Sequence, residues 1–254
     1  FVKTNVADLD SLHNLLHETV CNFGGVDVFV SNAGVLRAGG LEDMTPENFE
    51  FVTKINYNAY FYCAKAVSRV MKLQNKYAEE NYGDIIQINS KSGLRGSKAN
   101  FAYGGKFGGV GLTQSFALEL APFRIKVNSV CPGNFYEGPL WSNPENGLFL
   151  QYLHAGKVPG AKTVEDVRAY YMAQVPMRKG TGPEDVTKAV LYLIEQKPYE
   201  IALKKSRSSL GIAQARAENA RLNFMRVSEL YREKVAPPQK FDSARASKQE
   251  GDAE

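Results

Sequence analysis

Three short apolar segments, separated by longer amphipathic ones, restrict the folds open to this chain. Residues 26–31, 84–90 and 125–131 are rich in Val and Ile and have the length of buried strands. The stretches 9–23, 45–71 and 107–121 have the length and pattern of helices. Strands joined through helices form parallel sheets with right-handed crossovers. The pattern therefore predicts an α/β chain with a doubly wound parallel sheet.

Small and polar residues follow all three predicted strands: Asn32-Ala33-Gly34, Asn89-Ser90 and Pro132-Gly133. Ligands of open α/β sheets bind beyond the carboxyl ends of the strands, so this convergence predicts a binding site at that edge. Taken singly, each of these motifs is also what an ordinary turn contains.

Composition excludes several classes of protein. No segment reaches the ~18 apolar residues of a membrane span. The three cysteines (Cys21, Cys63, Cys131) have no CxxC spacing, which indicates no metal site and favours a reducing, cytoplasmic location. Residues 201–254 hold 11 Lys/Arg and 7 Asp/Glu, interleaved, so we expect no nucleic-acid partner. The first residue is Phe1, so the chain is interpreted as a fragment of a longer protein.

Residues 135–178 interrupt the alternation of strands and helices. The segment is rich in aromatic residues and follows the carboxyl end of a predicted strand. A substrate-covering lid would lie at this place. A helical insertion that packs its own small core explains the composition equally well.

The motifs in their order along the chain resemble the short-chain dehydrogenase/reductase family over residues 1–198. They are Asn5-Val6, Ser31-Asn32-Ala33-Gly34, Lys54-Ile55-Asn56, Ile88-Asn89-Ser90, Tyr103 with Lys106, and Asn128 followed by Pro132-Gly133. Within the family, the runs around Ser90 and Lys106 resemble the polyol and sugar dehydrogenases, which include sorbitol-6-phosphate dehydrogenases. The resemblance implies a Rossmann-like domain over residues 1–200, a nicotinamide cofactor (NAD or NADP) and a small-molecule alcohol or ketone as substrate.

The resemblance also implies the role of each site residue. Tyr103 would be the acid/base, Lys106 the cation that favours its phenolate, Ser90 the donor to the substrate oxygen, and Asn56 the holder of a water in a proton relay. The spacing supports Ser90 over Ser92, because Ser90 stands 13 residues before Tyr103. The implied cofactor-binding residues are Asn5, Val6, Asn32, Ala33, Gly34, Tyr103, Lys106, Pro132 and Gly133. Lys91 and Arg37 are candidate contacts for the phosphate of a sugar phosphate.

Three features depart from the family pattern. The glycine-rich nucleotide fingerprint is absent, so we expect a partial sheet that lacks the first βαβ unit. Two residues separate Tyr103 from Lys106, where the family has three. This shortening turns one side chain by about 100° around a helix and shifts it ~1.5 Å along the axis. If the helix is registered from Lys106, Ala102 occupies the tyrosine position.

The third departure lies beyond residue 200, where a helical pattern replaces the family's last strand. Apolar residues recur at three and four positions over 201–238, which predicts an amphipathic helical tail that packs on the body or on a partner helix. Residues 239–254 are polar, and we expect them to be disordered.

These features leave three interpretations open. The first is an active oxidoreductase that acts on a polyol or sugar. The second is a catalytically impaired remnant that keeps the helices through which the family forms homodimers or homotetramers. The third is a damaged gene, because a one-residue loss beside Tyr103 and an unrelated tail fit damage better than selection for a new activity.

Overall fold

A parallel three-stranded sheet forms the centre of the unit of residues 1–195. The computed structural model describes residues 1–37, 39–96, 102–194 and 197–253, with the backbone alone for residues 102–104, 197–199 and 202. Strands β1 (Val28–Ser31), β2 (Gly83–Ile88) and β3 (Ile125–Val130) lie in that order. The register places Ile85 between Phe29 and Val127. The predicted α/β class with a partial parallel sheet is confirmed.

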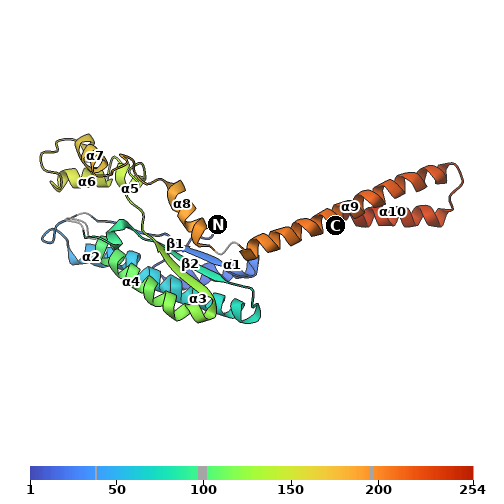
Figure 1. The fold of residues 1–254 in the computed structure, drawn as a ribbon, viewed down its shortest axis with the longest axis horizontal. Helices are drawn as coiled ribbons and strands as arrows, with labels where there is room; N and C mark the ends of the chain where they lie inside the picture. The colour runs from blue at the N-terminus through green and yellow to red at the C-terminus, as the bar shows by residue number, and fades with distance from the viewer. Residues whose placement is uncertain (38, 97–101, 195–196, 254) are drawn as a thin grey trace. The chain divides into compact units, whose positions relative to one another are not determined.

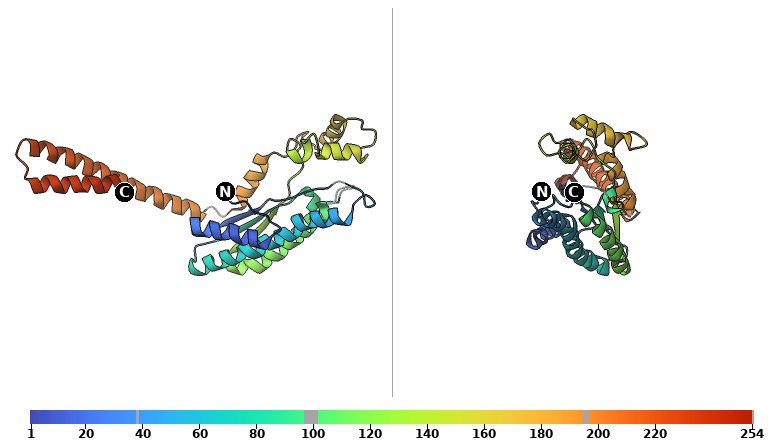
Figure 2. Two further views of the ribbon diagram at one scale, coloured as in Figure 1. Left: turned by 180° about the vertical axis from the view of Figure 1, so that it is seen from behind. Right: turned by 90° about the vertical axis from the view of Figure 1, so that its left-hand side faces the viewer.

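Three helices cover one face of this sheet: α1 (Leu9–Phe23), α3 (Ala59–Tyr77) and α4 (Ala102–Leu120) (Figures 1 and 2). Their inward residues and those of the strands form one apolar core, whose most buried members include Val67, Met71, Ile85 and Ile125. Helix α8 (Pro183–Leu193) contacts β3, where the Lys126 amine donates to the Leu193 carbonyl (3.0 Å).

The helix expected over residues 45–71 is divided by a π-helical turn. Helix α2 (Pro46–Thr53) begins at Thr45, whose hydroxyl accepts from the Asn48 amide. The π-helical turn η1 (Lys54–Asn58) follows and leads into α3. Such turns hold one residue more than an α-turn and are frequent at functional sites. Here the turn contains Asn56, which is 2% exposed.

Helix α4 lies unusually close to this π-helical turn because two of its residues lack side chains. A Cβ on Gly105 would lie 2.8 Å from the Asn56 Cβ, and one on Gly108 would lie 2.5 Å from the Tyr57 ring. Helix α4 also begins earlier than the predicted residue 107, at Ala102.

The segment between β3 and α8 forms a small helical lobe with its own aromatic core. It contains α5 (Pro139–Ser142), α6 (Leu148–His154) and α7 (Val164–Ala173). The Trp141 ring lies 5.0–5.7 Å, centroid to centroid, from the rings of Tyr136, Phe149, Tyr152 and Tyr171. This packing accounts for the aromatic composition noted in the sequence.

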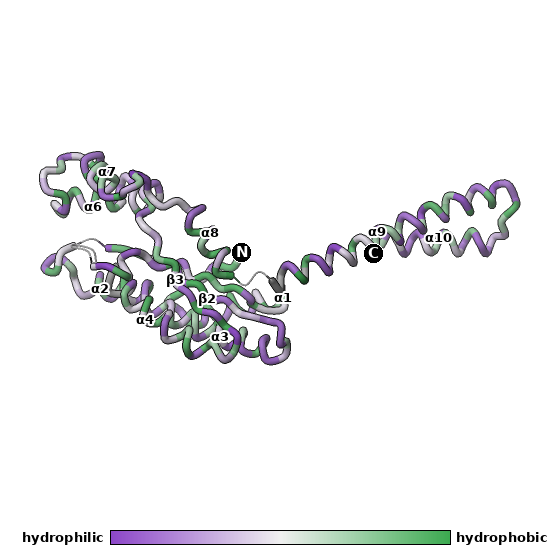
Figure 3. Tube along the Cα trace, in the orientation of Figure 1, coloured by the Kyte–Doolittle hydropathy of each residue, from purple (hydrophilic) through white to green (hydrophobic). Residues whose placement is uncertain are grey.

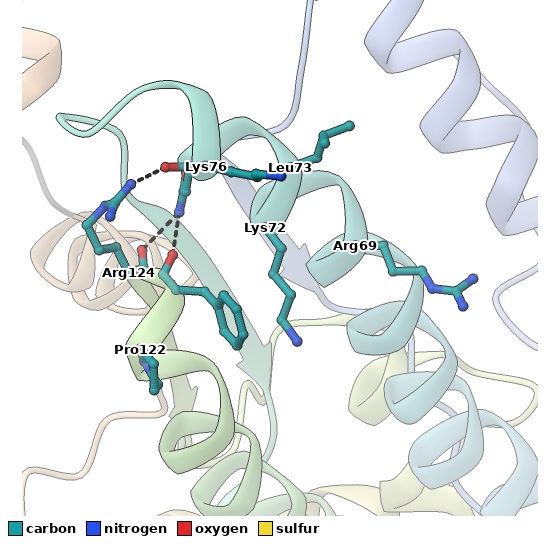
Figure 4. Close-up of a pocket in the computed structure, with 8 residues that line it drawn as sticks. Arg69, Lys72, Leu73, Lys76, Pro122 and Arg124 are labelled. Atoms are coloured by element: carbon teal, nitrogen blue, oxygen red, sulfur yellow. Dashed lines mark hydrogen bonds between the residues drawn. The ribbon is translucent and has the colours of Figure 1, made fainter.

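The Arg124 guanidinium caps the C-terminal end of α3 (Figure 4). Its guanidinium donates to the carbonyls of Asn75, Ala78 (3.2 Å) and Asn81 (3.2 Å), the last turn of the helix and the loop beyond it. The Asn75 amide donates in return to the Phe123 carbonyl (2.8 Å), and the Lys72 amine lies 4.3 Å from the centroid of the Phe123 ring. These contacts fix the turn that leads from α4 into β3.

Residues 196–254 form a separate unit. It is a hairpin of α9 (Lys197–Arg232) and α10 (Pro238–Ala253), both of which alternate between hydrophilic and hydrophobic residues (Figure 3). The expectation of disorder for residues 239–254 is corrected, because Phe241 stacks on Tyr231 (4.7 Å) and Ala244 is buried. These few apolar contacts order a segment that is otherwise polar. Within the described residues, no helix has the length and apolarity to cross a bilayer.

Two glycines of α4 provide a test of the close helix contact. Gly105→Ala should lower the free energy of unfolding by about 1–3 kcal/mol, because the new methyl group meets the Asn56 Cβ. Gly111→Ala in the same helix meets nothing within 4 Å and should stabilise the protein by up to about 1 kcal/mol. Urea unfolding of both variants measures the difference, and equal effects would contradict the proposed contact.

Candidate active site

A cavity of about 580 Å³ opens at the carboxyl edge of the sheet. Loops after all three strands line it, as the sequence predicted for this edge. Six of the predicted site residues are among its lining: Asn32, Gly34, Ser90, Lys106, Pro132 and Gly133. Two backbone hydrogen bonds extend the pairing of β2 and β3 into these loops, from the Asn89 amide to the Val130 carbonyl (2.8 Å) and from the Lys91 amide to the Pro132 carbonyl (2.9 Å).

Lys106 reaches from α4 to the end of β2. Its ammonium donates to the Ile88 carbonyl (3.2 Å), and the residue is 9% exposed. Burial lowers the pKa of Lys106 to about 8, while the nearby Cys131 thiol acts in the opposite direction. At neutral pH the side chain therefore still carries its charge, inside a site where water screens that charge poorly.

Asn56 lies beside Lys106 and holds the loop that follows β1. Its side-chain carbonyl accepts from the Val35 amide (2.9 Å), and its amino group donates to the Val35 carbonyl (2.8 Å). A Cβ on Gly34 would lie 3.4 Å from both the Asn56 Oδ1 and the Lys106 Nζ, so the two groups approach one point. Asn56 thus positions Gly34 and Val35, a role that the sequence did not reveal.

Ser90 follows β2 and is half-buried at the cavity wall. Its hydroxyl oxygen accepts from the Ser92 amide (3.1 Å), which caps the short 3₁₀ turn η2 (Lys91–Gly93). The side-chain amide of the neighbouring Asn89 donates to the Gln87 side-chain carbonyl (2.8 Å) and to the Lys106 backbone carbonyl (3.0 Å). The hydroxyl proton of Ser90 remains available to donate, since the bond to Ser92 uses only a lone pair.

Among the other predicted residues whose side chains the structure describes, Asn5, Val6, Ala33 and Asn56 are not part of the cavity lining. Tyr103 lies in the first turn of α4, but its side chain is outside the described residues, as is that of Ala102. Asn5 is exposed and forms the turn before α1, where its side chain accepts from the Ala7 amide (3.1 Å). Val6 is half-buried, and Ala33 is exposed.

Further residues that the sequence did not reveal line the cavity. Leu140, Trp141 and Leu148 come from the aromatic lobe, Thr181 from the segment before α8 and Thr187 from α8 itself. A Cβ on Gly133 would lie 2.8 Å from the Thr181 hydroxyl, so Gly133 allows the two segments to meet. The many aromatic residues in 135–178 indicated that this segment could lie near the site. The composition did not indicate which of their side chains would line the cavity.

At the carboxyl edge of this parallel sheet, polar groups from the strand ends and apolar side chains from the aromatic lobe line one cavity. The chain matches the family described as short chain dehydrogenase over residues 1–144, and it belongs to that family.

Three individual proteins of known name are similar to this chain. Sorbitol-6-phosphate 2-dehydrogenase of Escherichia coli K12 is 40% identical over 176 residues, which are 69% of this chain and 63% of the relative. The crystal structure of sorbitol-6-phosphate 2-dehydrogenase from Erwinia amylovora superimposes with a TM-score of 0.68 at 35% identity, covering 77% of this chain and 72% of that one. NAD⁺-bound xylitol dehydrogenase gives a TM-score of 0.65 at 29% identity, covering 75% and 70%. The chain thus spans about 63% of the length of its E. coli relative.

Burial of Lys106 predicts a specific dependence of stability on pH. The folded-state pKa of about 8 lies below the ordinary 10.5, so the unfolded chain binds the proton more tightly. This cost to stability is fully present below pH 8 and disappears as the pH rises toward 10.5, a gain of up to about 3 kcal/mol. In Lys106→Met, the free energy of unfolding should no longer show this gain between pH 7 and 10.5. Urea unfolding curves recorded across that pH range measure it.

The matched control is Lys188→Met, which changes an exposed lysine of α8. Its profile should follow that of the unaltered protein. If the free energy of unfolding changes with pH in the same way in Lys106→Met and in the unaltered protein, the lowered pKa of a buried Lys106 ammonium is contradicted.

Proposed function

We propose that this chain is an NAD(P)-dependent oxidoreductase that interconverts an alcohol and a ketone, with a polyol or sugar phosphate as substrate. One observation carries the proposal. The Ser90 hydroxyl and the buried Lys106 ammonium face one cavity at the carboxyl edge of the sheet, in a chain of the short-chain dehydrogenase family. The names of two relatives, both sorbitol-6-phosphate 2-dehydrogenases, support the substrate class.

The residues present fit the nicotinamide and ribose end of such a cofactor. Gly34 leaves open the space that a Cβ would fill between the Lys106 ammonium and the Asn56 carbonyl oxygen, which are the kind of polar groups that ribose hydroxyls bind. Pro132 and Gly133 would flank the nicotinamide, and Asn32 and Ala33 would contact it with backbone. Asn5 and Val6 would lie near the adenine. When bound, the nicotinamide supplies the hydride chemistry.

The protein itself must manage one proton and one developing oxyanion. Ser90 would donate to the substrate oxygen and stabilise its negative charge. Tyr103 would exchange the proton, although a phenol ordinarily titrates near ~10. The Lys106 ammonium, charged at neutral pH, would favour the phenolate form of Tyr103. Asn56 holds the loop at Gly34 that closes the site around these groups.

Replacement of the proposed acid/base tests this chemistry. The chain should bind NADH or NADPH, measured by fluorescence titration, and should oxidise sorbitol 6-phosphate in a coupled absorbance assay. Tyr103→Phe should lower kcat by ~10²–10⁴-fold with little change in cofactor affinity, because only the proton transfer is lost.

Tyr192→Phe is the matched control, since Tyr192 is 86% exposed on α8, and its kcat should be unchanged. A normal kcat in Tyr103→Phe would refute the assignment. No binding of either cofactor at millimolar concentration would refute the oxidoreductase itself.

A second candidate function is a non-catalytic interaction module. The outer surface of α3 and α4 exposes Phe61 (39%), Phe107 (46%) and Leu118 (81%), more apolar area than a solvated helix face needs. On α3, the cations Lys65 and Arg69 line a pocket together with Phe61. Association of this face with a second copy, as a homodimer or within a homotetramer, would persist without catalysis.

Sedimentation tests this surface. The unaltered chain should sediment as a dimer or tetramer, and Leu118→Asp should shift it to the monomer because a carboxylate would be buried between copies. The control Leu41→Asp alters an equally exposed leucine (88%) outside α3 and α4 and should leave the assembly intact. A monomer before any substitution would contradict the proposed interface.

A further inference from the structure

A group of buried polar side chains lies beneath the candidate active site and has no part in the chemistry described above. Gln87 of β2 is 2% exposed, and Ser129 is its register partner on β3. The Gln87 side-chain oxygen accepts from the Asn89 side-chain amide (2.8 Å) and from the Ser129 hydroxyl (3.2 Å). A carbonyl oxygen has two lone pairs, so these two donors satisfy it and offset the cost of burying the amide.

Helix α4 packs directly on these side-chain amides. A Cβ on Gly109 would lie 2.5 Å from the Gln87 Nε2 and 3.1 Å from the Asn89 Nδ2, so a larger residue would push the helix away. One turn further along α4, the Thr113 hydroxyl donates to the Gly109 carbonyl (2.9 Å) and lies 3.4 Å from the Gln87 oxygen. Gln87 and Asn89 therefore set how closely α4 approaches the sheet.

The Gln87 oxygen also determines which way the Asn89 side chain is turned. The Asn89 amino group has two protons, and it donates one to Gln87 and the other to the Lys106 backbone carbonyl (3.0 Å). The Asn89 Oδ1 is buried, and it has no hydrogen-bond partner within the described residues. The reversed amide would place this oxygen against two other carbonyl oxygens, so Gln87 favours the observed orientation.

Lys106 is bound to the same stretch of β2 at two places. Its backbone carbonyl accepts from Asn89, and its ammonium donates to the carbonyl of Ile88, the residue between Gln87 and Asn89. An outward movement of α4 at Lys106 would break the bond to Asn89. That bond depends in turn on Gln87, because Gln87 accepts the other proton of the same amino group.

We propose that Gln87 is a positioning residue, which acts through Asn89 to fix Lys106 so that its ammonium lies at the cavity beside Ser90. The effect of Gln87 on catalysis rests on the proposed function, whereas the position of the ammonium can be measured without turnover. Gln87 is not part of the cavity lining, so its influence on the site passes through Asn89, which does line the cavity.

Gln87→Met tests this role, because methionine has nearly the same shape but lacks the carbonyl acceptor. Without that acceptor Asn89 is free to turn, and the Lys106 ammonium gains access to water. NMR of isotope-labelled lysine follows the titration of Lys106, whose signal is identified by its absence in Lys106→Met. We expect the pKa of Lys106 to rise from about 8 toward the ordinary 10.5, by at least ~10-fold in proton affinity. With sorbitol 6-phosphate as substrate, kcat should fall by ~10-fold or more and KM should change little.

Asn75→Leu is the matched control. Asn75 is 4% exposed, and its side-chain amide also donates to a backbone carbonyl, that of Phe123 (2.8 Å), near the C-terminal end of α3. The variant loses a buried hydrogen bond of the same kind, so it measures the effect of a general loss of stability. The pKa of Lys106 and kcat should be unchanged in it.

An unchanged pKa of Lys106 in Gln87→Met, an equal change in Asn75→Leu, or a normal kcat in Gln87→Met would each overturn the positioning role. Asn89→Ala provides a second test if Gln87→Met fails to fold, because Asn89 lines the cavity and water can occupy the space of its amide. An unchanged pKa of Lys106 in that variant overturns the role as well.

The same measurements separate this role from the proposed function. A raised pKa of Lys106 in Gln87→Met, together with no turnover by the unaltered chain with either cofactor, would refute the proposed function and leave the position of the ammonium dependent on Gln87. Turnover by the unaltered chain, with the same pKa of Lys106 in all variants, would do the reverse.

Discussion

The close approach of α4 to the π-helical turn is the contact on which the candidate site depends. Gly105 and Gly108 bring the helix against Asn56 and Tyr57, and this places Lys106 deep enough to reach the end of β2. The Asn89 side chain then binds the Lys106 carbonyl, which ties the helix to the strand that carries Ser90. Any side chain at Gly105 would move the helix, and with it the one cation that the described residues place inside the cavity.

Charge at this edge of the sheet is concentrated at a cost to stability. Lys106 keeps an ammonium in a poorly solvated position, where burial lowers its pKa to about 8. This arrangement does not improve packing of the core. Such costs are common where a protein must bind or stabilise negative charge.

Sequence patterns predicted the sheet and its polar edge because strand burial and the parallel crossover leave a strong periodic signal. The resemblance to the family implied Ser90, Lys106 and Gly133 as site residues. All three line the cavity, and their roles stay predictions. The π-helical turn at Asn56 could not be predicted, because its extra residue leaves the apolar spacing of the helix almost unchanged. The order of α10 was missed because a few contacts such as Phe241 on Tyr231 outweigh a polar composition.

The Tyr103–Lys106 spacing shows another limit of sequence patterns. Helix α4 contains both Ala102 and Tyr103, so the helical backbone alone is compatible with either residue at the tyrosine position. The lobe residue Trp141 illustrates the same limit, because its place in the cavity wall depends on contacts between segments far apart in the chain.

The hairpin of α9 and α10 has a consequence for the order in which the chain folds. Tyr231 and Phe241 are close in sequence, because only a short loop separates their two helices. Phe29 and Ile85, which pair across β1 and β2, are much farther apart along the chain. Loop closure over short distances is fast, and parallel strand pairing is slow. The hairpin can therefore form before the strands of the sheet have paired. Until they pair, the strand edges are exposed, and this is when the chain is most vulnerable to aggregation.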